Sequence, residues 1–154
     1  MVRRILRAGE IVRMAVHSPG DVVLCFAIMR FIIGLPAALE RCDVRAFVRE
    51  LERAPRPRAR DAMTSYRRVV RIRDACLALP GLWQRNTCYV RAFTLYRFLD
   101  PADHCAALHV GVESRRDADR LRGHAWITLD GELLEGPDAV RDGALTEWVL
   151  DGAI

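Results

Sequence analysis

The sequence predicts an α+β domain, because the hydrophobic periodicity changes along the chain. Up to residue 101, apolar residues recur at helical spacings of three and four, most clearly in 62–79 and 84–101. From residue 106 onward they form short apolar or alternating runs typical of strands. Helices that precede a small antiparallel sheet indicate the α+β class. At 154 residues, the chain fits a single domain with a sizeable core.

We expect this domain, residues 1–154, to consist of a helical N-terminal part (1–60) and a core of helices and strands (61–154). The opening stretch carries apolar residues near one helical face and arginines outside it. This pattern fits a helix that docks a partner or a membrane surface, and equally the solvated back of a core helix. The proline- and arginine-rich stretch 53–61 is a loop or linker.

Residues 22–39 are nearly all apolar and about as long as a short transmembrane span. However, Arg30 at the centre would be costly in lipid, and Gly34 and Pro36 interrupt the run. The stretch that begins at Ser18 is typical of a helix start. We therefore expect a buried or lipid-contacting amphipathic helix here and not a membrane span.

The C-terminal part contains two helices and then strands. The helix at 62–79 ends at Pro80–Gly81, and the helical pattern at 84–101 closes at Asp100–Pro101. A buried strand at 106–112 and a charged loop at 113–123 follow. The last predicted feature is a hairpin, with strands at 123–129 and 132–135 around the turn Asp130–Gly131.

Composition argues against several classes of protein. All 24 basic residues are arginine, but the net charge is only +4 and the arginines are scattered among acids, which disfavours a nucleic-acid-binding protein. Five cysteines without CxxC spacing, and no secretory signal, predict free thiols and a cytoplasmic location. No zinc-ligand spacing is present, and we expect neither a metal nor a cofactor.

Cys88 is the candidate nucleophile. Asn86 or Thr87 is expected to cap the helix that follows, which places Cys88 in its first turn. The partial positive charge of a helix N-terminus favours a thiolate over a thiol there. The other four cysteines lie within helical patterns or just after a helix end and are interpreted as packing or incidental residues.

His124 is the candidate general base, since it occupies a position in an alternating strand that Val or Ile would normally fill. With a two-residue turn at Asp130–Gly131, Trp126 opposes Glu135. Glu135 would then lie diagonally across from His124 on the same face and could orient its imidazole. The alternative is a structural histidine beside a surface glutamate.

Three motifs carry a resemblance to a known family: C-x-x-R-A at 88–92, H-V-G-V at 109–112 and G-H-A-W-x-x-x-D-G at 123–131. Together they resemble the transglutaminase-like fold over roughly residues 60–140. They most resemble the B2 leader peptidases of lasso peptide biosynthesis, cysteine proteases that mature ribosomally made precursors. The resemblance implies a papain-type triad in which Cys88 is the nucleophile, His124 the general base and Glu135 the third member.

The chain departs from that family at two points. The family's acid commonly stands about twelve residues after the histidine, where this chain has Gly136, with Glu135 before it and Asp138 beyond. Residues 1–60 also do not read as the small leader-binding domain that many relatives carry. The resemblance therefore implies three partners: the lasso precursor peptide, a separate leader-binding protein, and an ATP-dependent macrolactam synthetase that receives the freed core.

Two other functions remain open. The same fold could act as an acyltransferase that passes a Cys88 thioester to an amine. Alternatively, the chain could be a non-enzymatic helical protein that docks partners or membrane. For the enzymes, the backbone N–H of Cys88 and the side chain of Gln84 are the candidate oxyanion donors.

Overall fold

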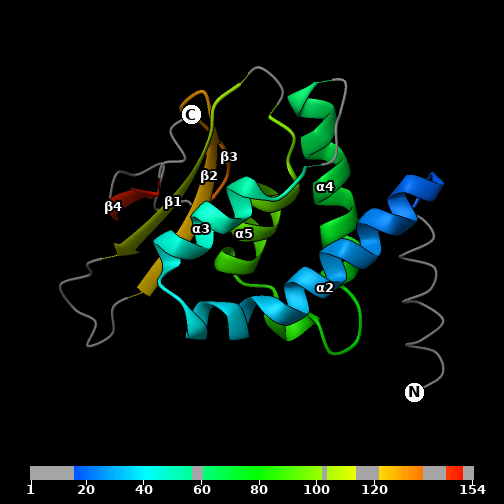
Figure 1. Ribbon diagram of the computed structural model, residues 1–154, viewed down its shortest axis with the longest axis horizontal. Helices are drawn as coiled ribbons and strands as arrows, with labels where there is room; N and C mark the ends of the chain where they lie inside the picture. Colours follow the sequence, from blue (N-terminus) through cyan, green and yellow to red (C-terminus); the bar gives the residue numbers. More distant parts are fainter. Residues whose placement is uncertain (1–15, 57–60, 102–103, 114–121, 137–144, 151–154) are drawn as a thin grey trace.

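The computed structural model describes residues 16–56, 61–101, 104–113, 122–136 and 145–150. The predicted basic helix at 3–13, most of the charged loop at 113–123 and the alternative acid Asp138 lie outside these residues. Figure 1 shows the helices gathered beside a small sheet. The elements in chain order are α2 (Pro19–Arg41), α3 (Val44–Arg53), α4 (Ala62–Leu77), the 3-10 turn η1 (Trp83–Arg85), α5 (Cys88–Phe98), β1 (Ala106–Glu113), β2 (Arg122–Leu129), β3 (Glu132–Glu135) and β4 (Leu145–Leu150).

This arrangement confirms the predicted α+β class. The described strands form one antiparallel sheet in the order β3-β2-β1-β4, and α5 lies against β2. The predicted helix at 84–101 begins later, at Cys88, because residues 83–85 form a separate 3-10 turn. Strand β4 was not predicted, although its run of β-branched and aromatic residues is typical of a strand.

Helix α2 begins where its sequence indicates. Ser18 is the N-cap, its hydroxyl accepts a hydrogen bond from the Asp21 N–H at 3.2 Å, and Pro19 takes the first helical position. The Asp21 carboxylate in turn accepts from the backbone N–H of His17 at 2.9 Å. These reciprocal bonds satisfy backbone donors that a helix N-terminus otherwise leaves unpaired.

Gly34 and Pro36, which interrupt the apolar run, do not end the helix, because α2 continues through both residues to Arg41. A proline inside a helix removes the hydrogen bond to the carbonyl four residues earlier, here that of Ile32. Arg85 supplies the missing donor: its Nη1 lies 3.5 Å from the Ile32 carbonyl oxygen and 3.2 Å from that of Ile33. Thus η1 docks on α2 at the carbonyl that the proline exposes.

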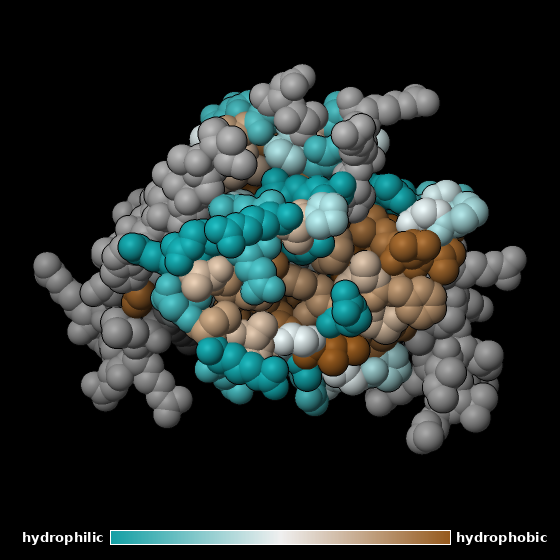
Figure 2. All heavy atoms as spheres, in the orientation of Figure 1, coloured by the Kyte–Doolittle hydropathy of each residue, from teal (hydrophilic) through white to brown (hydrophobic). Residues whose placement is uncertain are grey.

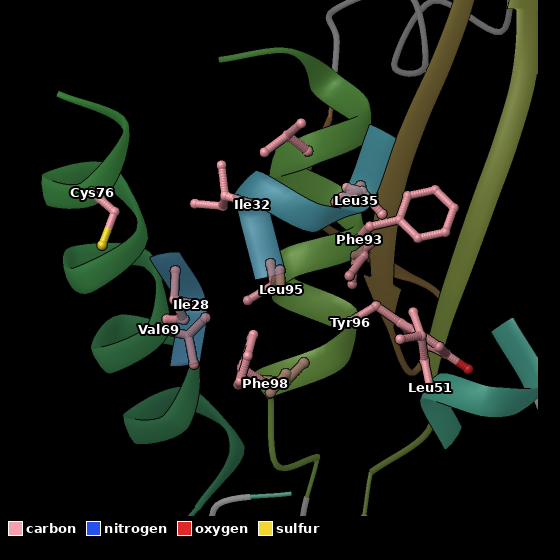
Figure 3. Packing of buried hydrophobic residues seen from close by; sticks show 14 of the residues in the cluster. Ile28, Ile32, Leu35, Leu51, Val69, Cys76, Phe93, Leu95, Tyr96 and Phe98 are labelled. Atoms are coloured by element: carbon pink, nitrogen blue, oxygen red, sulfur yellow. The ribbon is translucent and has the colours of Figure 1, made fainter. Parts of the chain in front are cut away.

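The hydrophobic core joins α2, α4 and α5 to the inner face of the sheet. Figure 3 shows Ile28 and Ile32 of α2 between Cys76 and Val69 of α4 and the side chains of α5. Ile28 and Ile32 are completely buried. Fully burying a side chain of this size contributes about 1.5–3 kcal/mol, so α2 is part of the domain's core.

Among the described helices, α2 is the one that is long and apolar enough to cross a membrane by length and composition. Its inner face nevertheless packs against α4 and α5, while other apolar side chains of the same helix face outward. A core helix of a water-facing domain explains the buried face.

The predicted hairpin turn between β2 and β3 is confirmed. Asp130 and Gly131 both have positive φ angles, 52° and 81°, which is the backbone of a type I′ turn. The Asp130 carboxylate accepts hydrogen bonds from the backbone N–H of Cys105, at 2.8 Å, and from the imidazole of His104. These bonds lower the pKa of Asp130 and tie the hairpin to the start of β1.

Candidate active site

Cys88 is the first residue of α5 and lies against the edge of the sheet. Thr87 is the N-cap, and its hydroxyl accepts a hydrogen bond from the Val90 N–H at 3.3 Å. The thiol is half-buried, and its Sγ lies 3.9 Å from the carbonyl oxygen of Gly123 on β2. The positive end of the helix dipole therefore coincides with a thiol held beside β2.

Gly123 allows this close approach. A Cβ at this position would lie 2.3 Å from the hydroxyl oxygen of Tyr89, the second residue of α5. Burial, together with the nearby charge of Cys88, raises the pKa of Tyr89, so its hydroxyl stays neutral. The absence of a side chain at Gly123 and the position of the Tyr89 ring therefore determine the distance between β2 and the N-terminus of α5.

His124 follows Gly123 and pairs with Gly111 of β1. Because side chains alternate along a strand, His124 lies on the same face of β2 as Trp126 and Thr128. Ala125 lies on the other face, which faces α5. Within the described residues, β3 pairs with β2 only from Ile127 to Leu129. The Cys88 thiol thus lies beside a stretch of β2 that β3 leaves unpaired among the described residues, one residue from His124. Because the side chain of His124 starts on the face of β2 opposite α5, a thiol–imidazole pair would have to form around this unpaired margin of the strand.

The predicted register between β2 and β3 is wrong at Glu135. Thr128 opposes Leu133 as expected, but Glu135 opposes Ile127 and not Trp126. The extra residue is Leu134, which forms a β-bulge. Its side chain packs on the core, and its carbonyl accepts a hydrogen bond from Tyr66 at 3.3 Å.

Because a one-residue shift moves a side chain to the other face, Glu135 does not share the face of His124. Its carboxylate is held by two arginines instead. Arg73 of α4 donates to both oxygens, at 2.6 and 3.1 Å, and the Nε of Arg91 donates to one of them. Glu135 therefore links β3 to α4 and α5.

Arg73 is the most deeply buried charged residue among those described, with 0% of its surface exposed. It also donates to Asp74, at 2.9 Å, and to the backbone carbonyl of Arg91, at 3.3 Å. Arg91 lies 3.3 Å from Asp74 and donates to the Asn86 side chain at 3.2 Å. The cluster balances two guanidinium groups with two carboxylates, as a buried charge requires.

A pocket of about 220 Å³ opens beside the thiol. Small residues form part of it, since a Cβ at Gly136 would lie 2.8 Å from the Cβ of Trp126. Such a pocket next to a nucleophile can receive one substrate side chain. Its lining consists of Cys88, Arg91, Ala92, Ala125, Glu135 and Gly136.

The pairing of Arg73 and Arg91 with Glu135 was not predicted from the sequence, although the sequence pattern indicated that Arg73 would be buried. Arg73 falls on the apolar face of its helix, next to Ile72 and one turn from Val69 and Cys76. A charge in that position needs a buried partner. Gln84, the expected oxyanion donor, is exposed in η1, and its role stays a prediction.

The remaining cysteines differ in exposure. Cys25 and Cys76 are buried with their sulfur atoms 3.6 Å apart, and burial beside Cys25 raises the pKa of Cys76 to about 12. Cys42 is half-buried and donates to the carbonyl of Ala38. Cys105 is exposed. Over the described part of the chain, no group of three or more metal-ligating side chains occurs.

A helix that begins with a cysteine and packs on an antiparallel sheet, with a histidine on the neighbouring strand, is an arrangement that thiol-dependent enzymes use. The family model for the transglutaminase-like superfamily matches residues 22–146, and the chain belongs to this superfamily. The superfamily includes cysteine peptidases and acyltransferases. The match includes α2 and α3, which lie ahead of the motifs that carried the sequence resemblance. No curated protein and no solved structure gives a significant match.

Proposed function

We propose that this protein is a cysteine peptidase that removes the leader from a lasso peptide precursor. The observation that carries the proposal is the contact of the Cys88 thiol with the Gly123 carbonyl, next to His124, at a stretch of β2 that β3 does not pair with among the described residues. Superfamily membership supports thiol chemistry at this point. The lasso specificity rests on the three sequence motifs.

In the proposed reaction, the imidazole of His124 accepts the thiol proton, and Cys88 Sγ attacks the scissile carbonyl carbon. The tetrahedral intermediate collapses to a thioester as the C–N bond breaks, and the imidazolium gives its proton to the leaving amine. Water, deprotonated by the same imidazole, then hydrolyses the thioester. The backbone N–H of Cys88 is the proposed oxyanion donor, since the first N–H groups of a helix have no partner within it.

The bulge at Leu134 changes which acidic residue can be the third member of the triad. Glu135 points to the arginines, and a Cβ on Gly136 would point to Trp126, which shares the parity of His124. Asp138, the other acid that the sequence offers close to this position, lies outside the described residues. We therefore propose Asp138 as the acid that orients His124, and Glu135 as the residue that fixes the end of β3.

The experiment is the incubation of the protein with a lasso precursor peptide, followed by mass spectrometry. Cleavage is expected with the wild type and should be lost in Cys88→Ala and His124→Ala, whose circular dichroism should remain native. Normal cleavage by Cys88→Ala would exclude the cysteine-peptidase mechanism. Cys42→Ala, at a half-buried thiol on α2's C-cap, is the matched control.

The proposed partners make a second comparison possible. A separate leader-binding protein should raise the cleavage rate, because it raises the local concentration of substrate. Equal rates with and without it would contradict this part of the proposal. The freed core is proposed to pass to an ATP-dependent macrolactam synthetase, and the reactions are proposed to occur in the cytoplasm.

The acyltransferase is the second candidate, because the superfamily contains both activities. The two differ in the acceptor of the thioester. Added primary amine, such as glycinamide, should appear in the product of an acyltransferase. Release of a free carboxylate in the presence of excess amine supports the peptidase.

A further inference from the structure

The outer face of α2 exposes a row of apolar side chains. Val23 is 70% exposed, Phe26 66% and Ile33 52%. Trp83 in η1 is 63% exposed and lies beside this row, since Arg85 of the same turn donates to the carbonyls of α2. Figure 2 shows hydrophobic residues gathered over α2. We call this surface the α2 face; it consists of Val22, Val23, Phe26, Ile33 and Trp83.

The charge on this surface is positive. Between Asp21 and Glu40, α2 contains no acidic residue, and Arg30 is its one charged side chain. Arg30 is exposed on the same helix as the apolar row. An apolar row with an arginine at its centre and no acid fits an anionic surface that also has an apolar interior.

Two hollows follow one flank of α2 and extend this surface. Their volumes are about 290 and 420 Å³, and they share Ala27, Arg97 and Phe98, so they are contiguous. The first is bordered by the exposed Val23, and the second by Arg30 and Glu50. The α2 face therefore adjoins a partly apolar groove.

Arginines crowd the first hollow. Arg56, Arg68 and Arg97 all line it. Arg68 is paired with Asp21 at 2.7 Å, Arg97 donates to the carbonyl of Pro55 at 3.0 Å, and the guanidinium of Arg56 lies over the ring of Tyr96. The Nε of Arg56 is buried without a hydrogen-bond partner in the part of the chain that the structure describes. Burial, together with the positive charge of Arg56, lowers the pKa of Arg97. A bound anion would stabilise the charged forms of neighbouring arginines that repel each other.

We propose that the α2 face docks on the surface of an anionic phospholipid bilayer. The apolar row enters the headgroup region, and Arg30, Arg56 and Arg97 bind lipid phosphates. Docking on the surface and not spanning follows from the inner face of α2, which is part of the core. The arginines that line the groove distinguish an anionic lipid surface from an apolar protein partner, which would not require them. This inference does not depend on the proposed peptidase activity.

The test is flotation of the full-length protein with vesicles of phosphatidylcholine alone and with vesicles containing 30% phosphatidylglycerol. Binding is expected to the anionic vesicles and to weaken at high salt. Arg56→Gln and Arg97→Gln should each lower the partition coefficient about fivefold. The double variant Val23→Ser/Phe26→Ser should abolish binding to the anionic vesicles.

Matched controls lie on α4, where Met63 is 42% exposed and Arg67 is also exposed. Met63→Ser and Arg67→Gln should bind as the wild type does, and thermal unfolding should show that all variants are folded. Equal binding to both vesicle types, or wild-type binding by the α2-face variants, would overturn the proposal. So would a wild-type dimer that the Val23→Ser/Phe26→Ser variant dissociates in the absence of vesicle binding, because the face would then be a subunit interface.

Discussion

Arg73 on α4 and Glu135 on β3 form a two-point ion pair, with nitrogen–oxygen distances of 2.6 and 3.1 Å. The pair closes the bulged end of the hairpin onto the helices, directly beside the pocket that contains Cys88. Since Arg73 is completely buried, the carboxylate is its main compensation for lost hydration.

Replacement of Glu135 should therefore cost stability more than chemistry. Glu135→Gln removes the negative charge and leaves the buried Arg73 with Asp74 as its remaining carboxylate partner, which should lower the free energy of unfolding by about 1.5–3 kcal/mol. Urea unfolding followed by circular dichroism measures this loss. Glu132→Gln, at an exposed position of the same strand, should change it little. A native stability for Glu135→Gln would refute the structural role.

Asp138→Asn should have the opposite profile. If Asp138 orients His124, kcat falls while the unfolding free energy stays near that of the wild type. The loss should be smaller than the factor of about 10⁴ known for a serine protease, because a thiol ionises more easily than a hydroxyl. Steady-state kinetics on the precursor measure it. A crippled, stable Glu135→Gln beside an active Asp138→Asn would restore Glu135 to the triad.

Alkylation should separate the cysteines by exposure and environment. Iodoacetamide is expected to modify Cys88 and the exposed Cys105 and to spare the buried Cys25 and Cys76. In a Cys105→Ser background, His124→Ala should slow the modification of Cys88 near neutral pH, as read by peptide mass spectrometry. His104→Ala, at the base of the hairpin, is the control. Unchanged Cys88 kinetics in His124→Ala would argue against a thiol–imidazole pair.

Stability should fall at alkaline pH because of Cys76. Its ordinary thiol pKa of 9.0 is raised to about 12 in the folded protein, so the fold favours the neutral thiol. This contribution is fully present below pH 9 and is lost as the pH rises toward 12, at up to about 1.4 kcal/mol per pH unit. Urea midpoints between pH 8 and 10 should decline less in Cys76→Ala than in Cys105→Ala. Parallel declines in the two variants would contradict the assignment.

Because Gly123 lies close to the Tyr89 hydroxyl, Gly123→Ala should reduce activity, and removal of that hydroxyl should restore it. Gly123→Ala brings a methyl group to 2.3 Å from the Tyr89 hydroxyl, so β2 or the ring must move. A displacement of this size near the nucleophile can reduce the rate by up to about a hundredfold. Because the hydroxyl is the clashing atom, Gly123→Ala/Tyr89→Phe should recover most of the loss in kcat/KM. A double variant no better than Gly123→Ala would show that the clash is not the cause.

The sequence predicted those parts of the fold that local rules control. The Ser18 cap, the start of the cysteine helix and the Asp130–Gly131 turn each depend on a few neighbouring residues, and the structure confirms all three. Periodicity also placed α4 within two residues of its observed end.

Long-range relations were less predictable. The bulge at Leu134 depends on Tyr66 and on the core, neither of which is near it in the chain, and it reverses the parity of Glu135. Continuation of α2 through Pro36 likewise depends on Arg85, about fifty residues away. In both cases a distant side chain supplies the hydrogen bond that a local pattern leaves missing.

The Arg85–Ile32 contact also limits how this protein can be shortened. A fragment that starts at residue 61 would keep every proposed catalytic side chain but lose the carbonyls on which η1 is anchored, three residues before the nucleophile. It would also expose Val69 and Cys76, now covered by α2. A transplant of the cysteine helix and hairpin into another scaffold must therefore include α2 or a substitute for its segment around Ile32 and Pro36.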